Sequence, residues 1–239
     1  MELRTGTPEE AGMSSRRIQY VRALASSWVE DGITPALVVL AARRGVIVLD
    51  EAYGRLNPEV DSPVLQRDSI FPLASITKPI TATAVMALVE DGLLGLNRPV
   101  QSYIPEFQGD GKDAVLVHHL LTHTSGLDVG HDLSWLGKKR DDVGLPPGEK
   151  TQHPNIQADL IANYEAPLAK KPGDEMSYCN FNYALLGEIV RRLSGQSLAS
   201  FATKRIFEPL GMNDTHFIVP DSVKSRIVKR PPDSPYALG

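Results

Sequence analysis

Ser75 and Lys78 are the residues whose types and spacing best suit chemistry. They stand three positions apart in Ser-Ile-Thr-Lys, at the start of a segment with helical apolar periodicity. On a helix this spacing places both side chains on one face, with Cβ atoms about 5–6 Å apart. A lysine amine beside a serine hydroxyl can accept its proton, once burial or nearby positive charge lowers the lysine pKa, and can thereby activate the serine as a nucleophile.

The expected place of Ser75 at a helix start adds a second part of that chemistry. Backbone N–H groups and the positive end of the helix dipole favour a developing oxyanion there. Pro79 is compatible with this placement, because proline is tolerated in the first helical turn and not deeper. A capping serine followed by a solvated lysine would give the same motif, so this alternative stays open at the level of the motif.

Tyr178 and Asn180 form the second candidate pair, in Ser-Tyr-Cys-Asn before another helical segment. In an extended segment, residues two apart point to one side, and Cys179 points to the other. A phenol that shares its proton with Lys78 can carry a proton from nucleophile to leaving group, and an amide can hold a substrate carbonyl or fix the lysine. A half-buried aromatic and a helix-capping asparagine are the alternatives.

Histidine and cysteine offer weaker candidates. His119 and His123 have the i, i+4 spacing of zinc ligands on a helix, with His118 adjacent, but no third ligand is evident and we expect no metal. Cys179 is the only cysteine, which excludes an intrachain disulfide. No histidine is paired with it in the sequence, so we expect a buried or half-buried, unreactive thiol.

The elements that must position these residues follow from periodicity and turn signals. Ile18, Val21, Leu24 and Trp28 predict a helix from Ser14 or Ser15 to Gly32, and two β-rich runs around a glycine-containing turn predict a hairpin over 36–53. From about residue 70 to 210 the pattern is helical. Helices are predicted over 77–91, 117–122, 156–164, 182–194 and 197–207, and no element over 220–239.

Composition limits the class of protein and its partners. The 239 residues are 42% hydrophobic and 23% charged, which is typical of globular chains. The net charge of -4 argues against a nucleic-acid partner. The longest apolar run, 36–42, is far shorter than the roughly 20 residues that span a bilayer, so no membrane partner is expected. The first fifteen residues lack a signal-peptide core, which predicts a cytoplasmic protein if Met1 is the native start.

The two motifs, in this order and separation, resemble the serine β-lactamase and penicillin-binding protein superfamily, particularly class C β-lactamases, D-alanyl-D-alanine carboxypeptidases and family VIII esterases. The likeness runs from about residue 5 to residue 217. The resemblance implies that Ser75 is the acylated nucleophile, Lys78 its basic partner, Tyr178 the proton carrier and Asn180 a substrate contact. Other segments with the family pattern are 71–78, 117–127, 172–173, 183–190 and 210–215.

The resemblance also implies a fold and an activity. The expected fold is α/β (α+β), an antiparallel sheet flanked by helices with a large, mostly helical domain. We assign 1–69 to the N-terminal helix and hairpin of the α/β domain, 70–217 to the mostly helical domain that carries both motifs, and 218–239 to an interrupted connection toward a C-terminal part. The expected activity is serine hydrolysis of a small-molecule ester or amide, without cofactor or metal. A small-ester esterase is our first hypothesis, because the sequence predicts a cytoplasmic location. A β-lactamase or D-alanyl-D-alanine carboxypeptidase and an inactive binding relative are the alternatives.

One family motif is missing from the sequence. Members carry Lys-Thr-Gly, Lys-Ser-Gly or His-x-Gly on a strand beside the nucleophile, where it supplies the second oxyanion N–H. Lys150-Thr151 precedes Tyr178 and is followed by Gln, and Lys224-Ser225 is followed by Arg226. A side chain there would obstruct the close backbone approach that glycine permits. We therefore expect an incomplete sheet that a C-terminal segment or a second chain completes.

Overall fold

The computed structural model describes residues 3–59, 61–128, 160–161 and 163–229. They form two compact units. Unit 1 combines the chain up to Pro72 with the chain from Val219 onward, and unit 2 runs from Leu73 to Ile218. Each unit has a hydrophobic cluster of its own, so each is described by itself.

Unit 1 contains the predicted helix and hairpin. Helix α1 spans Ser15–Glu30, and strands β2 (Ala36–Arg43) and β3 (Val46–Gly54) pair antiparallel. The hairpin turn is Arg44 and Gly45, both with positive φ, 54° and 78°. Two such residues make the type I′ geometry whose twist matches that of paired strands. Both predictions are therefore confirmed.

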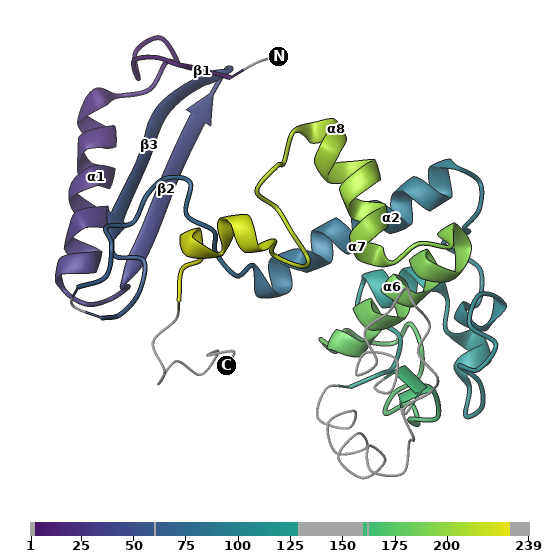
Figure 1. Cartoon of the computed structure of the whole chain (residues 1–239). Helices are drawn as coiled ribbons and strands as arrows, with labels where there is room; N and C mark the ends of the chain where they lie inside the picture. The colour runs from purple at the N-terminus through teal and green to yellow at the C-terminus, as the bar shows by residue number, and fades with distance from the viewer. Residues whose placement is uncertain (1–2, 60, 129–159, 162, 230–239) are drawn as a thin grey trace. The chain divides into compact units, whose positions relative to one another are not determined.

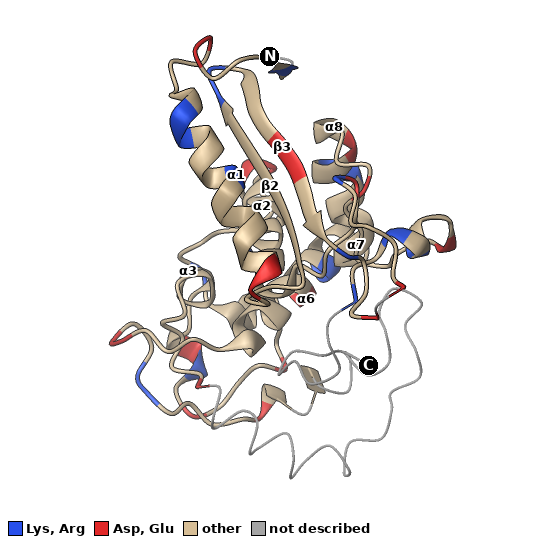
Figure 2. Cartoon of the chain, turned by 90° about the vertical axis from the view of Figure 1, so that its left-hand side faces the viewer, with Lys and Arg blue, Asp and Glu red and all other residues tan. Residues whose placement is uncertain are grey.

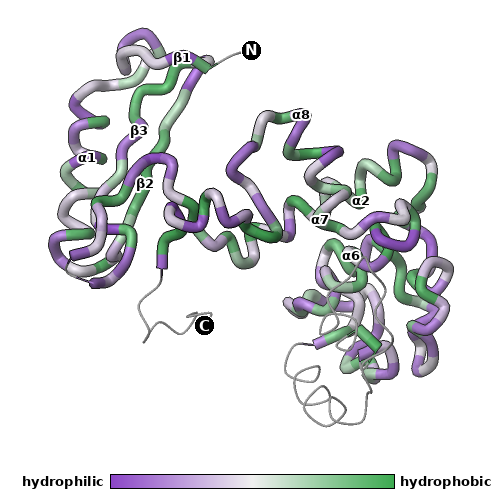
Figure 3. Tube along the Cα trace, viewed as in Figure 1, coloured by the Kyte–Doolittle hydropathy of each residue, from purple (hydrophilic) through white to green (hydrophobic). Residues whose placement is uncertain are grey.

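Helix α1 lies along one face of this sheet (Figure 1). Hydrophobic and hydrophilic residues alternate along it (Figure 3), but only Ile18 and Ala25 are buried. Val21, Leu24 and Trp28 of the predicted apolar stripe are 37–40% exposed. A charged contact supports the packing: the acidic stretch of β3 (Figure 2) includes Glu51, which accepts a hydrogen bond from Arg22 of α1 at 2.8 Å.

Two expectations for unit 1 are wrong. A third strand, β1 (Arg4–Thr5), pairs in parallel with β3, so the sheet order is β1-β3-β2 rather than a lone hairpin. Two residues are too few to show the alternation that reveals a strand in sequence. A 3₁₀ helix also forms over Asp221–Arg226, where no element is predicted. A contact distant in sequence fixes the chain just after this helix: the Val228 N–H donates to the Ile70 carbonyl at 2.9 Å.

Unit 2 is helical, as predicted. Its described helices include α2 (Thr77–Glu90), α3 (Val117–Leu121) and α6 (Asn180–Ser194), whose ends agree with the predictions to within two residues. The short 3₁₀ turns are Ala74–Ile76, Val100–Ser102 and Lys112–Ala114. Of the helix predicted over 156–164, residues 160–161 and 163–164 are helical, and the other positions lie outside the described residues.

The prediction of one regular helix over 197–207 is wrong, both because the helix is interrupted and because it ends later. Helix α7 covers only Leu198–Ala202, a π-helical turn follows over Thr203–Phe207, and α8 continues over Glu208–Leu210. Pro209 lacks the N–H that would continue the α-helical ladder, and an irregular turn precedes it. Gly211, with φ 66°, ends the segment.

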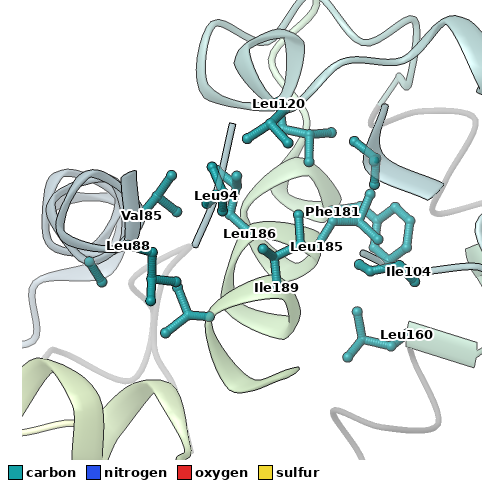
Figure 4. Close-up of a cluster of buried hydrophobic side chains, with 14 of the residues drawn as sticks. Val85, Leu88, Leu94, Ile104, Leu120, Leu160, Phe181, Leu185, Leu186 and Ile189 are labelled. Carbon is teal, nitrogen blue, oxygen red and sulfur yellow. The ribbon is translucent and has the colours of Figure 1, made fainter. Parts of the chain in front are cut away.

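The core of unit 2 is built between α2 and α6 (Figure 4). Val85 and Leu88 of α2 and Leu185, Leu186 and Ile189 of α6 are at most 1% exposed. The same cluster holds side chains from the segments between α2 and α6, α3 included: Leu94, Ile104, Phe107, Leu120 and Leu160. Burial of these faces fixes α6 against α2, and both helices begin with candidate site residues.

We expect Leu185→Ala to lower the free energy of unfolding of unit 2 by about 2–5 kcal/mol, because a large-to-small change in a core leaves a cavity. Leu93→Ala, at a leucine that is 52% exposed, is the matched control and should change it by no more than about 0.5 kcal/mol. Urea unfolding followed by circular dichroism measures both. Equal losses would contradict the assignment of Leu185 to the core.

Candidate active site

Ser75 lies in the 3₁₀ turn that leads directly into α2. The residue before it, Ala74, has φ 46°, in the left-handed region that residues other than glycine rarely adopt. Ser75 is exposed, and Pro79 follows in the first turn of α2. The structure thus presents the serine at a helix start, on a backbone held in an unfavourable conformation of the kind found at functional sites.

Lys78 lies one turn further along, on the same side as Ser75. Its Nζ is 3.3 Å from the Ser75 Oγ and donates to the Asn180 Oδ1 at 2.8 Å. The side chain is half-buried. The amine therefore contacts both a hydroxyl and an amide of the candidate residues, which the capping alternative does not require.

The segment before α6 brings in the second motif. Cys179 is extended, with φ -137° and ψ 124°, and its side chain is 1% exposed. Tyr178 and Asn180 on either side of it are exposed, as the alternation predicts. The Tyr178 hydroxyl donates to the Ser75 Oγ at 2.8 Å. Asn180 is the first residue of α6, and its side chain binds Lys78 instead of capping the helix.

The electrostatics of this group make Tyr178 more acidic than an ordinary tyrosine. Hydrogen bonding to Lys78 and then to Ser75 lowers the pKa of Tyr178. The Lys78 Nζ lies 4.6 Å from the centroid of the Tyr178 ring and 5.6 Å from that of the Tyr183 ring. An ammonium this close stabilises negative charge on the phenol, which makes Tyr178 a better proton acceptor.

The structure adds supporting residues that the sequence reading assigned no role at this site. The His123 ring lies 4.6 Å from the Tyr178 ring, centroid to centroid, and Asn182 is fully buried beside it. Asn182 accepts a hydrogen bond from the Ser125 hydroxyl at 2.6 Å. One feature of the sequence could have revealed Asn182. It is a polar residue two positions after Asn180, on the helix face that otherwise carries buried apolar residues.

Gly126 allows the loop that carries His123 to pack closely. Its φ is 86°, and a Cβ placed on it would lie 2.2 Å from the Lys170 carbonyl oxygen. Its own carbonyl accepts hydrogen bonds from the N–H groups of Ala169 and Lys170. Only glycine combines that conformation with that approach, so this position is tied to the loop geometry rather than to chemistry.

The histidines do not assemble a metal site within the described part of the chain. No group of three His, Cys, Asp or Glu residues there is placed to hold an ion. His119 Nδ1 accepts from the Leu116 N–H at 3.1 Å, and the His118 ring lies 4.2 Å from the His119 ring. No helix among the described residues is long and apolar enough to cross a membrane.

Comparison with known proteins decides the family. The family model described as Beta-lactamase matches residues 21–237. The chain belongs to the β-lactamase family. It is 38% identical over 189 residues to Esterase EstB of Burkholderia gladioli, covering 76% of this chain and 46% of the esterase. It is 33% identical over 177 residues to penicillin-binding protein 4* of Bacillus subtilis (strain 168), covering 74% of this chain and 37% of that protein.

A solved structure supports the same assignment. The structure of EstCE1 matches with a TM-score of 0.73 at 25% identity, over 89% of this chain and 55% of that one. EstCE1 is described as a hydrolase with promiscuous acyltransferase activity. The expected β-lactamase/transpeptidase-like fold, with helices and an incomplete sheet, is therefore confirmed. The chain spans about half the length, or less, of the relatives it matches.

The two partial matches to the third motif do not lie on a described strand. Lys224-Ser225-Arg226 is part of the 3₁₀ helix, where Lys224 pairs with Asp221 at 2.6 Å. Lys150-Thr151 lies outside the described residues. None of the three described strands carries the motif. The second oxyanion donor that the family resemblance implies is therefore not identified on them.

We expect Lys78→Met to raise the pKa of Tyr178 toward the ordinary tyrosine value of about 10, because the variant lacks the ammonium that stabilises the phenolate. Ultraviolet titration of each protein, minus that of its Tyr178→Phe counterpart, isolates this one phenol. Lys204→Met, at an exposed lysine of the π-helical turn, is the matched control. An unchanged Tyr178 titration in Lys78→Met would show that the two groups do not interact.

Proposed function

We propose that this chain is a serine hydrolase that forms an acyl-enzyme on Ser75 and acts on small acyl esters. The observation that carries the proposal is the approach of two proton-transfer groups to one hydroxyl. The Ser75 Oγ lies 2.8 Å from the Tyr178 oxygen and 3.3 Å from the Lys78 Nζ. Nucleophile and base within hydrogen-bond reach, with a third group that orients the base, is the arrangement that activates a serine.

The proposed reaction begins with Tyr178 as a phenolate beside the Lys78 ammonium. Ser75 Oγ attacks the ester carbonyl carbon while its proton passes to the Tyr178 oxygen, and the Lys78 ammonium stabilises the charge on that oxygen. The carbonyl electron pair moves to oxygen and then returns as the alkoxide leaves. Tyr178 gives its proton to the alkoxide, which yields the alcohol and the acyl-enzyme. Water attacks the acyl-enzyme by the same route and releases the acid, and no cofactor or metal takes part.

Asn180 has two proposed tasks at this site. Its Oδ1 accepts from Lys78 at 2.8 Å, which holds the amine toward Ser75. Its amide N–H groups remain able to donate to a substrate carbonyl. We therefore propose Asn180 as the substrate contact and as the residue that orients Lys78.

Similar proteins support an ester substrate first. Esterase EstB is named as an esterase and EstCE1 as a hydrolase with acyltransferase activity. A second candidate function, acylation by β-lactams or D-alanyl peptides, is favoured by the similarity to penicillin-binding protein 4*. Both candidate functions use the same nucleophile, so they are distinguished by which substrates the protein turns over.

The sheet of unit 1 supports the proposal that further strands complete this sheet. Strand β2 lies at the end of the order β1-β3-β2, so its outer backbone groups have no strand partner among the described residues. An edge with open N–H and C=O groups readily accepts another strand. We propose that a C-terminal segment or a second chain adds strands to the sheet and supplies the third motif. Residues 218–239 would connect to it.

We expect the chain to hydrolyse p-nitrophenyl acetate and butyrate and to turn over fluorescent penicillin slowly or not at all. Ser75→Ala should abolish acylation, because it removes the attacking oxygen, while it costs at most about 2 kcal/mol of stability. Ser102→Ala, at an exposed serine of another 3₁₀ turn, is the matched control. Mass spectrometry locates the acyl group.

The outcomes separate the hypotheses. Stable penicillin label without turnover favours a penicillin-binding role, and neither ester turnover nor label favours an inactive binding relative. Retained burst kinetics in Ser75→Ala would remove Ser75 as the nucleophile. The same assay on a chain extended by downstream coding sequence tests the sheet proposal, and equal rates for the two chains would contradict it.

We expect Lys78→Ala and Tyr178→Phe each to lower the acylation rate by orders of magnitude. The double variant should be little slower than the slower single variant, because residues that act as one proton-transfer unit are strongly non-additive. Stopped-flow measurement of acylation gives the three rates. Fully additive losses would show that the two residues do not share a proton.

A further inference from the structure

His123 lies in the loop after α3, in contact with the segment that carries Tyr178. Its φ is 58°, an uncommon value for a residue with a side chain, and its ring is half-buried. The ring lies 4.6 Å from the Tyr178 ring and 5.3 Å from the Tyr183 ring, centroid to centroid. The imidazole therefore packs against the phenol whose oxygen reaches Ser75.

His123 also binds the backbone on both sides of Tyr178. Its carbonyl accepts from the Ser177 N–H at 2.8 Å, and its Nδ1 accepts from the Cys179 N–H at 3.3 Å. A residue held at both neighbouring positions, with its ring packed on the same partner, has little freedom to move. His123 thereby restrains the backbone on both sides of Tyr178 and packs against its ring.

These contacts fix the protonation state of the ring. A backbone N–H can only donate, so the Nδ1 that faces Cys179 must carry a lone pair and not a proton. Asn182 lies 3.1 Å from the same Nδ1. Its Oδ1 receives the Ser125 hydroxyl, so its NH₂ is the group turned toward His123. Two donors therefore meet at Nδ1, and the ring proton belongs on Nε2.

We propose that His123 is a positioning residue for Tyr178, which works only as the neutral Nε2–H tautomer and releases the Tyr178 segment when Nδ1 gains a proton. A proton on Nδ1 would face the Cys179 N–H, removing that hydrogen bond and opposing two donors. The effect on acylation rests on the proposed function, whereas the tautomer and the hydrogen bond do not.

The surroundings of the ring favour its neutral form. The titratable groups that face it are Lys78 from α2, Tyr183 from α6 and Tyr178 from the segment before α6; Cys179 meets it through its backbone. Burial and then the Lys78 charge lower the pKa of His123 below the usual histidine value of about 6.5. The positioning contact is therefore complete at neutral pH and is lost as the pH falls through that lowered pKa.

Nitrogen-15 NMR of the whole chain tests the tautomer directly. The expected result at neutral pH is an Nε2–H imidazole for His123, with a Cys179 amide resonance that shifts as His123 titrates. The shift should be absent in His123→Asn, because asparagine tolerates positive φ and places an acceptor oxygen where Nδ1 lies, but does not titrate. An Nδ1–H tautomer or an imidazolium at neutral pH, or an amide shift that persists in His123→Asn, overturns the proposal.

The pH profile of Ser75 acylation by a fluorescent phosphonate gives the functional readout. His123→Phe keeps a ring but removes the acceptor, and we expect it to lower acylation by about 10²-fold, the usual consequence of a small misplacement. His123→Asn should recover part of that rate and lose the acidic limb that His123 contributes. His118→Asn, at the half-buried histidine of α3, should keep the wild-type profile. An acidic limb that is the same in His123→Asn and wild type overturns the proposal.

The two levels of proposal fail differently. A wild-type chain without any phosphonate label contradicts the proposed function, and the NMR result then decides the role of His123 by itself. If wild type is labelled and His123→Asn and His123→Phe lose the same share of the acylation rate, Ser75 stands as the nucleophile and the acceptor role of His123 is removed. Where His123→Phe does not fold, the comparison of His123→Asn with wild type carries the test.

Discussion

The packing of α6 against α2 is the interaction on which the candidate site depends. Ser75 and Lys78 stand at the start of α2, and Asn180 at the start of α6, 102 residues from the lysine that it binds. No local preference can hold such distant groups within hydrogen-bond distance. The burial of Leu185, Leu186 and Ile189 against α2 does so, because a close-packed core leaves each helix few alternative positions.

A buried polar network then refines what the core positions. Asn182, on the same helix, joins Ser125 and His123. Polar groups this deep are stable only when they are hydrogen-bonded, so each of them constrains its neighbours. The network fixes the loop after α3, and that loop holds the extended segment at Tyr178. Gly126 permits the close packing of the same loop.

All four candidate residues belong to unit 2, although the family is defined over most of the chain. The hydroxyl, amine, phenol and amide of the candidate site are arranged within one helical unit. The component that the family resemblance implies and the described strands lack is the second oxyanion donor, a backbone N–H on a strand. Under the proposed function, proton transfer would rest on unit 2, and oxyanion stabilisation, usually the largest single contribution to such catalysis, would need the missing donor.

The sequence by itself determined the elements and the motif residues. Helical periodicity located α2 and α6, a glycine-containing turn located the β2–β3 hairpin, and the spacings Ser-x-x-Lys and Tyr-x-Asn set which side chains share a face. These features are local, since they depend on residues a few positions apart. Only the tertiary structure decided the rest. Strand β1 exists because β3 pairs with it, and His123 contacts Tyr178 because two segments 55 or more residues apart pack together. Such contacts leave no periodic trace in the sequence, because their partners are brought together by the burial of other residues.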